Sequence, residues 1–342
     1  MEQGIEDEPT PWVVGRVISA HAKLYSVMTE DGEIVAEVTG KYAYQQASQN
    51  TYPAVGDWVV MDVQEGKGLI QKTLSRKTKF SRKIAGTETI EQIVAANFDT
   101  VFIVNALNKD YNIRKLERYL VVAWESGARP VVILSKADLC NDVDDKLLEV
   151  ESIALGVDIH PISSIYGDGL EDLKVYLKPG KTVVVLGSSG VGKSTLVNTL
   201  AGNDILKVQK VREDDDRGRH TTTHRELVLL PGGGMILDTP GMRELGLWTG
   251  KEGLDNVFEE ILTLSHMCKF TDCSHRSEPG CAVREAIENG TLTKERLESY
   301  DKLKKEAAYI EHKQVRRAKL DEKRLSRNTN TVRNRISEHD MV

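Results

Sequence analysis

This chain of 342 residues has no long apolar run and few cysteines. No stretch approaches the roughly 18 apolar residues that a membrane-spanning helix needs. The opening MEQGIEDEPTP is acidic and lacks the basic and then apolar order of a secretory signal. Four cysteines in so long a chain do not make a disulfide framework. These absences predict a globular protein of the cytoplasm without a membrane partner.

Negative charge outweighs positive charge over the whole chain, but positive charge is concentrated near the C-terminus. The formal net charge is −6, whereas segment 302–335 holds twelve Lys and Arg against four Asp and Glu. A charge run is often only the solvated face of a helix. On an acidic protein, however, a basic segment favours an acidic partner, and nucleic acid is the first candidate.

Short strands separated by turns are expected from Trp12 to Leu74. Five such strands suit a small barrel of the oligonucleotide-binding (OB) type, with an SH3-like barrel as the alternative. The run RKTKFSRK at 76–83 then gathers cations around Phe80. This mixture suits contact with a phosphate backbone, and a solvated linker fits it equally well.

Strands and helices alternate from about Glu91 to Leu247. Buried-strand patterns such as TVFIVNA, RPVVILS and KTVVVLG are each followed by a segment with helical spacing. This alternation predicts a mostly parallel sheet covered by helices on both faces. The remainder, from about Lys251, is expected to be helical apart from a cysteine cluster.

A phosphate-binding loop is indicated by the motif GxxxxGK[ST] between strand TVVVL and a following helix. A chance glycine-rich turn would not be expected to carry the whole motif in that setting. Its backbone amides and helix N-terminus would face phosphate, Lys193 would reach the β- and γ-phosphates, and Ser194 would bind Mg²⁺. The expected nucleotide-binding residues here are Gly187, Ser188, Ser189, Gly190, Val191, Gly192, Lys193, Ser194 and Thr195.

Two further segments suit the metal and the γ-phosphate. Asp238 ends the apolar strand GGMIL, where a carboxylate can hold the metal's water shell, and Gly241 can sense the γ-phosphate. Between the two motifs, a polar loop carries Thr221, Thr222 and Thr223. One of these threonines is expected to contact Mg²⁺, which would make the loop a switch.

Guanine recognition is predicted for the segment Ser135-Lys136-Ala137-Asp138, which directly follows strand PVVIL. A carboxylate accepts both N1–H and N2–H₂ of guanine, and adenine offers no matching donors. Ser135 stands where GTPases usually have Asn or Thr, so we expect guanine specificity with reduced affinity. Ser163 and Ser164 resemble a loop that contacts the base through backbone N–H groups. The similar run Asn108-Lys109-Asp110 lacks the spacer residue and is expected to be a turn.

The order of these motifs is unusual, because the base-reading segments precede the phosphate loop. The same sheet can form if the original termini are joined and the chain is cut elsewhere. The cut falls after the second switch, so DTPGMREL leads directly into the cysteine-containing region. We therefore expect a γ-phosphate-dependent movement to reach that region.

A zinc site is predicted from Cys268, Cys273, His275 and Cys281. Three thiolates and an imidazole within fourteen residues are the ligands of a closed tetrahedral zinc, which would be structural because no position is left for water. Reduced cysteines in a small core are the alternative. His266 could replace His275 as a ligand.

The water-orienting group is not evident, because Met242 follows the DxxG motif where a Ras-like enzyme has Gln. Hydrolysis by the protein alone should therefore be slow. His220 is the candidate catalytic residue, with a group supplied by the partner as the alternative.

Together, these motifs resemble the ribosome small subunit-dependent GTPase A family, which consists of circularly permuted GTPases. The resemblance rests on EQIVAANFD, SKADL, GSSGVGKST, GRHTTT, LDTPGMREL and CKFTDCSHRSEPGCAV, in that order. It implies a multidomain α/β protein with an OB barrel, a permuted GTPase domain and a zinc domain, acting late in maturation of the small ribosomal subunit. The expected boundaries are an acidic arm at 1–10, a barrel with basic linker at 11–83, a GTPase domain at 88–247 and a zinc-binding helical domain at 251–342.

The expected function is thus a GTP-hydrolysing switch that binds GTP or GDP, the small subunit and its 16S rRNA, with a monomer as the default. Two other functions are alternatives. One is an RNA-binding protein in which GTP only stabilises the fold. The other is a P-loop kinase or ATPase, against which the Asp138 segment and the lack of an acceptor-binding lid argue.

Overall fold

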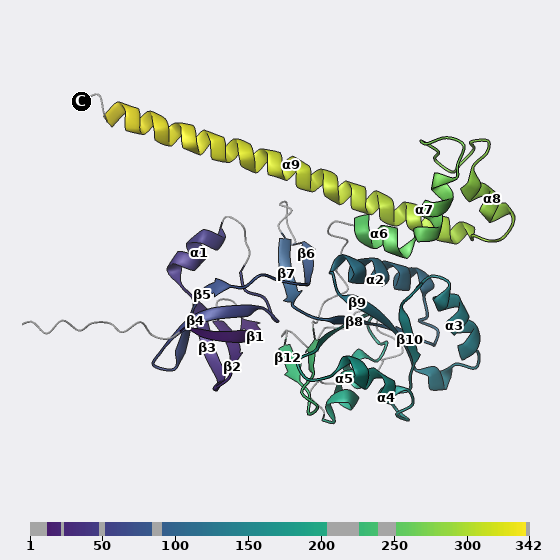
Figure 1. The fold of residues 1–342 in the computed structure, drawn as a ribbon, viewed down its shortest axis with the longest axis horizontal. Helices are drawn as coiled ribbons and strands as arrows, with labels where there is room; N and C mark the ends of the chain where they lie inside the picture. Colours follow the sequence, from purple (N-terminus) through teal and green to yellow (C-terminus); the bar gives the residue numbers. More distant parts are fainter. Residues whose placement is uncertain are drawn as a thin grey trace, which may run out of the picture.

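The computed structural model describes residues 12–21, 24–47, 52–83, 91–203, 226–238 and 251–339. Within them lie a small barrel, a helix-covered sheet and a helical C-terminal part that ends in a long projecting helix (Figure 1). The multidomain α/β prediction is confirmed.

The barrel consists of five strands with one helix inserted between the third and the fourth. The strands are β1 (Val13–His21), β2 (Leu24–Thr29), β3 (Gly32–Val38), β4 (Trp58–Gln64) and β5 (Lys67–Thr73), and the helix is α1 (Gly40–Ala47). It closes because β1 pairs with both β2 and β4, while β3 runs parallel to β5. This five-stranded closure confirms the OB prediction over the SH3-like alternative. Val17, Val27, Met61 and Ile70 fill its core.

The second sheet has the strand order β10-β9-β8-β11-β13-β12. All pairings are parallel except that of β12 with β13. The strands are β8 (Thr100–Ala106), β9 (Arg129–Ser135), β10 (Asp158–Pro161), β11 (Thr182–Gly187), β12 (Glu226–Leu229) and β13 (Met235–Asp238). The side chains of β8, β9 and β11 are buried on both faces, as their continuous apolar runs predict.

Helices cover both faces of this sheet. Side chains of α2 (Ile113–Glu125) and α3 (Val143–Glu151) pack on one face. Those of α4 (Leu170–Leu173) and α5 (Lys193–Ala201) pack on the other. Two single 3-10 turns, η1 (Ala137–Leu139) and η2 (Lys174–Tyr176), complete this part.

The basic run after the barrel contains a strand. Residues Lys79–Lys83 form β6, which pairs with β7 (Glu91–Ala96). Phe80 is buried and stacks on Phe98 with ring centroids 4.7 Å apart. Phe80 is therefore part of the core around the larger sheet and is not available to stack on a nucleic-acid base, contrary to one of the two interpretations of this run. The boundary at residue 83 stays a prediction.

The barrel and the larger sheet are joined through β1. Ser19 of β1 pairs with Glu226 of β12, so the two sheets are continuous. The buried Arg16 donates to the carbonyl of Asn97 at 2.6 Å and to that of Gly56 at 3.3 Å. Gly56 has φ 92°, and a Cβ there would lie 2.0 Å from the Ala96 carbonyl oxygen, so only glycine fits this junction.

The C-terminal part packs on α2. It comprises α6 (Lys251–Val257), α7 (Glu259–His266), α8 (Ala282–Glu288) and α9 (Lys294–His339). Figure 1 shows α6 and the first turns of α9 above α2, while the rest of α9 extends away from the body. No described helix combines the length and the apolar character needed to cross a membrane.

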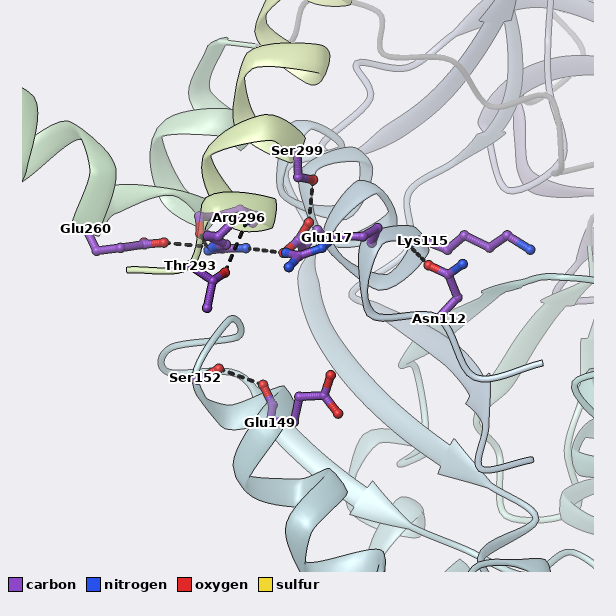
Figure 2. A network of polar contacts seen from close by, with 11 residues as sticks. Asn112, Lys115, Glu117, Glu149, Ser152, Glu260, Thr293, Arg296 and Ser299 are labelled. Atoms are coloured by element: carbon purple, nitrogen blue, oxygen red, sulfur yellow. Dashed lines mark hydrogen bonds and ion pairs between the residues drawn. The ribbon is translucent and has the colours of Figure 1, made fainter. Parts of the chain in front are cut away.

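A buried ion-pair network fixes this packing (Figure 2). Arg296 of α9 donates to Glu117 of α2 at 2.9 Å and to Glu260 of α7 at 2.8 Å. The Glu117 side chain is fully buried and also accepts from the Ser299 hydroxyl. The guanidinium of Arg296 further lies 4.1 Å from the ring centroid of Phe258. One arginine thus connects three helices of two domains.

Replacing Arg296 with alanine should destabilise the protein by about 1.5–3 kcal/mol, because it removes charge-assisted hydrogen bonds from the buried Glu117 carboxylate and leaves it with the partly exposed Arg114 and with Ser299. Arg118 is the matched control, since it also joins α2 to α9 through Glu306, but with both side chains about one-third exposed. Arg118→Ala should cost only ~0–1 kcal/mol. Urea unfolding measures both variants, and equal losses would contradict the role given to the buried network.

Candidate nucleotide and zinc sites

The phosphate loop lies at the carboxyl end of β11 and leads into α5, as predicted. Gly187 has φ 148°, and a Cβ at this position would lie 2.4 Å from the Val104 carbonyl oxygen. Gly190 and Gly192 also have positive φ values, of 78° and 91°. The glycines of the motif are therefore required by the backbone path, which brings the loop close to β8.

Lys193 at the start of α5 folds over this loop. Its ammonium donates to the carbonyl oxygens of Gly187 and Ser188 at 2.9 and 2.6 Å. The charge is thus held directly at the loop, from where the side chain can turn to a bound phosphate. Ser194 and Thr195 follow in the first turn of α5, beside the helix N-terminus that favours anions.

The base-reading segment lies next to the phosphate loop and is hydrogen-bonded to it. The Ser135 hydroxyl donates to the Val191 carbonyl at 2.6 Å, and Lys136 Nζ donates to the Gly190 carbonyl at 2.8 Å. Lys136 has φ 58°, which turns the chain sharply after β9. Asp138 follows in η1 with an exposed side chain. The hydroxyl of Ser135 therefore keeps the bridge between the two loops.

Ser163 and Ser164 lie beside this segment, after β10. The backbone N–H of Ala137 donates to the Ile162 carbonyl at 3.0 Å, which connects the two loops directly. The Ser163 side chain is buried and accepts from the Tyr166 N–H at 3.3 Å. The structure thus places the segments 135–138, 163–164 and 187–195 at one edge of the sheet.

The similar run at 108–110 is a turn, as expected. The Asn108 side chain accepts from the Asp110 N–H at 3.0 Å, and its carbonyl accepts from the Tyr111 N–H at 2.9 Å. Asp110 is thereby held in a local turn ahead of α2.

The metal-side and switch residues are only partly described. The backbone of Asp238 ends β13, beside β11, at the edge where the phosphate loop lies. His220, Thr221, Thr222, Thr223, Gly241 and Met242 lie outside the described residues. Their roles stay predictions.

The four expected zinc ligands converge. One ligand atom from each of Cys268, Cys273, His275 and Cys281 lies within 4.8 Å of the others. His275 Nδ1 is 3.7 and 3.5 Å from the sulfurs of Cys268 and Cys281, which are 3.9 Å apart. Ligands about 2.3 Å from a tetrahedral zinc lie roughly 3.8 Å from one another, so the cluster fits that ion. His266 is not part of the cluster.

The surroundings of this cluster suit metal ligation. The Ser265 hydroxyl donates to the Ile261 carbonyl at 2.7 Å and lies 3.1 Å from His275 Nε2. It must therefore accept from Nε2–H, which leaves the Nδ1 lone pair facing the thiols. Burial, reinforced by Lys304, lowers the pKa of His275, so the imidazole is neutral at neutral pH. Cys281 caps α8 and accepts from the Arg284 N–H at 3.5 Å.

The sequence carried no signal for several of these supporting groups. Ser265 lies ten positions before His275 and resembles any polar helix residue. Val191 acts through its carbonyl, which the sequence motif does not specify. Such partners become visible only when the backbone has been placed.

The chain matches a family model described as RsgA GTPase over residues 73–248. Small ribosomal subunit biogenesis GTPase RsgA 2 of Lactiplantibacillus plantarum is 48% identical over 90% of this chain and 88% of its own length. Small ribosomal subunit biogenesis GTPase RsgA of Methanosarcina acetivorans is 41% identical over 92% of this chain and 84% of its own length. Among solved structures, YjeQ from Thermotoga maritima is similar, with a TM-score of 0.65 and 31% identity over 87% of this chain and 99% of that one. YloQ, described as a circularly permuted GTPase, has a TM-score of 0.61 and 24% identity over 90% of this chain and 98% of that one.

The metal assignment predicts one zinc per chain in protein purified without chelator. Cys281→Ser should lose that zinc and lower the melting temperature, because thiolate ligation links the loop to α8. Cys140→Ser is the matched control, since Cys140 lies after η1 and outside the cluster. Elemental analysis measures the metal, and a full zinc complement in Cys281→Ser would contradict the assignment.

Proposed function

The chain belongs to the RsgA GTPase family and is a GTP hydrolase, and on that premise we propose that it serves small-subunit biogenesis through a cycle of GTP hydrolysis that the subunit stimulates. The observation that carries the proposal is the pair of hydrogen bonds from Ser135 and Lys136 to the phosphate loop. A single nucleotide must contact the base-reading and the phosphate-binding segment at once. These bonds hold the two segments next to each other.

Guanine would be read by the Asp138 carboxylate, which accepts from N1–H and N2–H₂. Lys136 would pack its stem over the base while its ammonium stays on Gly190. Backbone N–H groups at Ser163 and Ser164 would contact the base from the neighbouring loop. The Ser135 hydroxyl donates to the Val191 carbonyl, so it has less hydrogen-bonding capacity left for the base than the longer Asn side chain would have. This supports the expected reduction in nucleotide affinity.

The phosphates would lie on the amides of 187–195 and at the N-terminus of α5. Lys193 would turn from its loop carbonyls to the β- and γ-phosphates. Mg²⁺, when bound with GTP, neutralises charge that develops on the phosphate oxygens. Ser194 and Asp238 would hold it, with one of Thr221, Thr222 and Thr223 added in the GTP state. His220 is proposed to orient the attacking water, because Met242 has no polar atom to do so.

Binding to the small subunit and its 16S rRNA would involve the C-terminal helix. Beyond Ile310 the described side chains of α9 are not buried, and Lys302, Lys305, Lys313 and Arg316 are exposed. A projecting basic helix suits a phosphate backbone. The zinc would fix the loop between α7 and α8 as a rigid part of the same surface. We propose that the protein acts in the cytoplasm as a monomer.

Steady-state GTP hydrolysis with and without purified small subunits tests this function. The protein alone should be slow, small subunits should stimulate turnover strongly, and large subunits should not. His220→Ala should reduce the stimulated rate by roughly 10²-fold if the imidazole acts in proton transfer or water positioning. Slow turnover under all conditions would instead favour an RNA-binding protein in which GTP is structural.

Asp138→Asn tests the assignment of the base. Losing charge-assisted bonds of about 1.5–3 kcal/mol should weaken GTP binding roughly 10- to 100-fold. Xanthosine triphosphate should bind better than before, because its 2-oxo group can accept from the new amide. Asp110→Asn, in the local turn before α2, is the control and should bind GTP normally. Titration calorimetry with ATP as a competitor completes the test, since effective competition by ATP would indicate a different nucleotide class.

A further inference from the structure

A hollow of about 490 Å³ opens on the barrel, far along the chain from the nucleotide loops. It lies where α1 packs beside β5, and Val60 of β4 also lines it. Its aromatic and apolar wall is formed by Trp12, Tyr42 and Val60, and its polar rim by Thr39, Lys41, Gln71 and Lys72. Among the described residues, two lysines and no carboxylate line it, which makes this described lining positively charged.

The polar rim is produced by an irregularity of β5. Val60 pairs with Lys72, whereas the next residue, Met61, pairs with Ile70. Gln71 is therefore an extra residue in β5, a β-bulge. Such a bulge redirects side chains, and here the consecutive Gln71 and Lys72 both line the hollow.

The helical wall is also held in place. The Thr39 hydroxyl accepts from the Tyr42 N–H at 3.3 Å and so caps the start of α1. The Tyr42 hydroxyl is hydrogen-bonded to Thr73 of β5 at 2.7 Å. Lys41 lies between these two anchored residues and remains exposed. These hydrogen bonds therefore fix the backbone that carries Lys41, the lysine that α1 contributes to the rim.

Trp12 supplies a stacking surface at the mouth of the hollow. Its side chain is 64% exposed, and Val14, two residues further along the chain in β1, is 49% exposed. Val14 pairs with Val60, so an apolar strip leads from the mouth to Val60 in the lining. An exposed indole beside two cations has the chemistry of a single-stranded nucleic-acid site.

We propose that this hollow binds an unpaired nucleotide of single-stranded RNA, with the base stacked on Trp12 and flanking phosphates on Lys41 and Lys72. The volume lies within the roughly 300–1,000 Å³ typical of pockets that hold ligand-sized groups. The inference rests on the proposed RNA contact and assigns it a place on the barrel. The described residues of this rim offer two cations and no carboxylate to a ligand, which suits the phosphates of RNA better than the cations of a protein segment.

Fluorescence anisotropy of the full chain with a labelled octauridylate tests the proposal, with a hairpin duplex of the same length as the structured comparison. Trp12→Ala should weaken octamer binding roughly 5- to 100-fold, and Trp12→Phe should retain it, because stacking needs only an aromatic face. Lys41→Ala with Lys72→Ala should reduce the slope of log Kd against log salt by about 1.4, which corresponds to two phosphates. Hairpin binding should change less in each variant.

The controls are Tyr166→Ala, an exposed aromatic of the GTPase part, and Lys67→Ala, an exposed lysine at the other end of β5. Both should bind the octamer as the wild type does. Octamer binding that is unchanged in Trp12→Ala, or that falls equally in the control variants, would overturn the proposed RNA site. GTP hydrolysis by the wild type with and without small subunits is measured separately. The proposed function can therefore hold even if the octamer does not bind in the hollow. Conversely, loss of octamer binding in Trp12→Ala supports the pocket even if subunits do not stimulate hydrolysis.

Discussion

The carboxyl ends of parallel strands lie at one edge of a sheet, and the nucleotide site depends on that constraint. Strands β9, β10, β11 and β13 all run in the same direction, so the loops that follow them meet whatever their order in the chain. This is why the base-reading segment can precede the phosphate loop by about fifty residues and still bond to it. Ser135 and Val191 are distant in sequence but joined at 2.6 Å. Circular permutation changes the connections of this sheet and leaves its edge intact.

The permutation also places the C-terminal part directly after DTPGMREL, the segment expected to be the second switch. That part is not loosely attached, because Arg296 joins α9 to Glu117 of α2 and to Glu260 of α7. Since α2 connects β8 to β9, the same helix supports the base-reading strand and carries the zinc-binding region. A change at the nucleotide therefore has two physical routes to the C-terminal surface, one along the chain and one through α2. This supports the expectation that nucleotide state reaches the cysteine-containing loop.

Motifs whose chemistry depends on consecutive residues could be predicted from the sequence, and so could the strands and helices around them. The phosphate loop, the zinc ligands and the five barrel strands belong to this class, because periodicity and spacing are local properties. Interactions between distant segments could not be predicted. Arg296 and Glu117 look like ordinary helix-surface residues, and Phe80 looked available to nucleic acid until its stacking on Phe98 placed it in the core. The hollow on the barrel depends on a bulge at Gln71, which pairing alone defines.

Hydrogen exchange with and without GDP tests most directly whether these loops form one guanine-nucleotide site. The account predicts that GDP protects the amides of 135–138, 163–164 and 187–195 together, while the turn at 108–110 exchanges as before. ADP at the same concentration should protect none of them. Protection confined to 187–195, or equal protection by ADP, would contradict the assembly of a guanine site from these permuted loops.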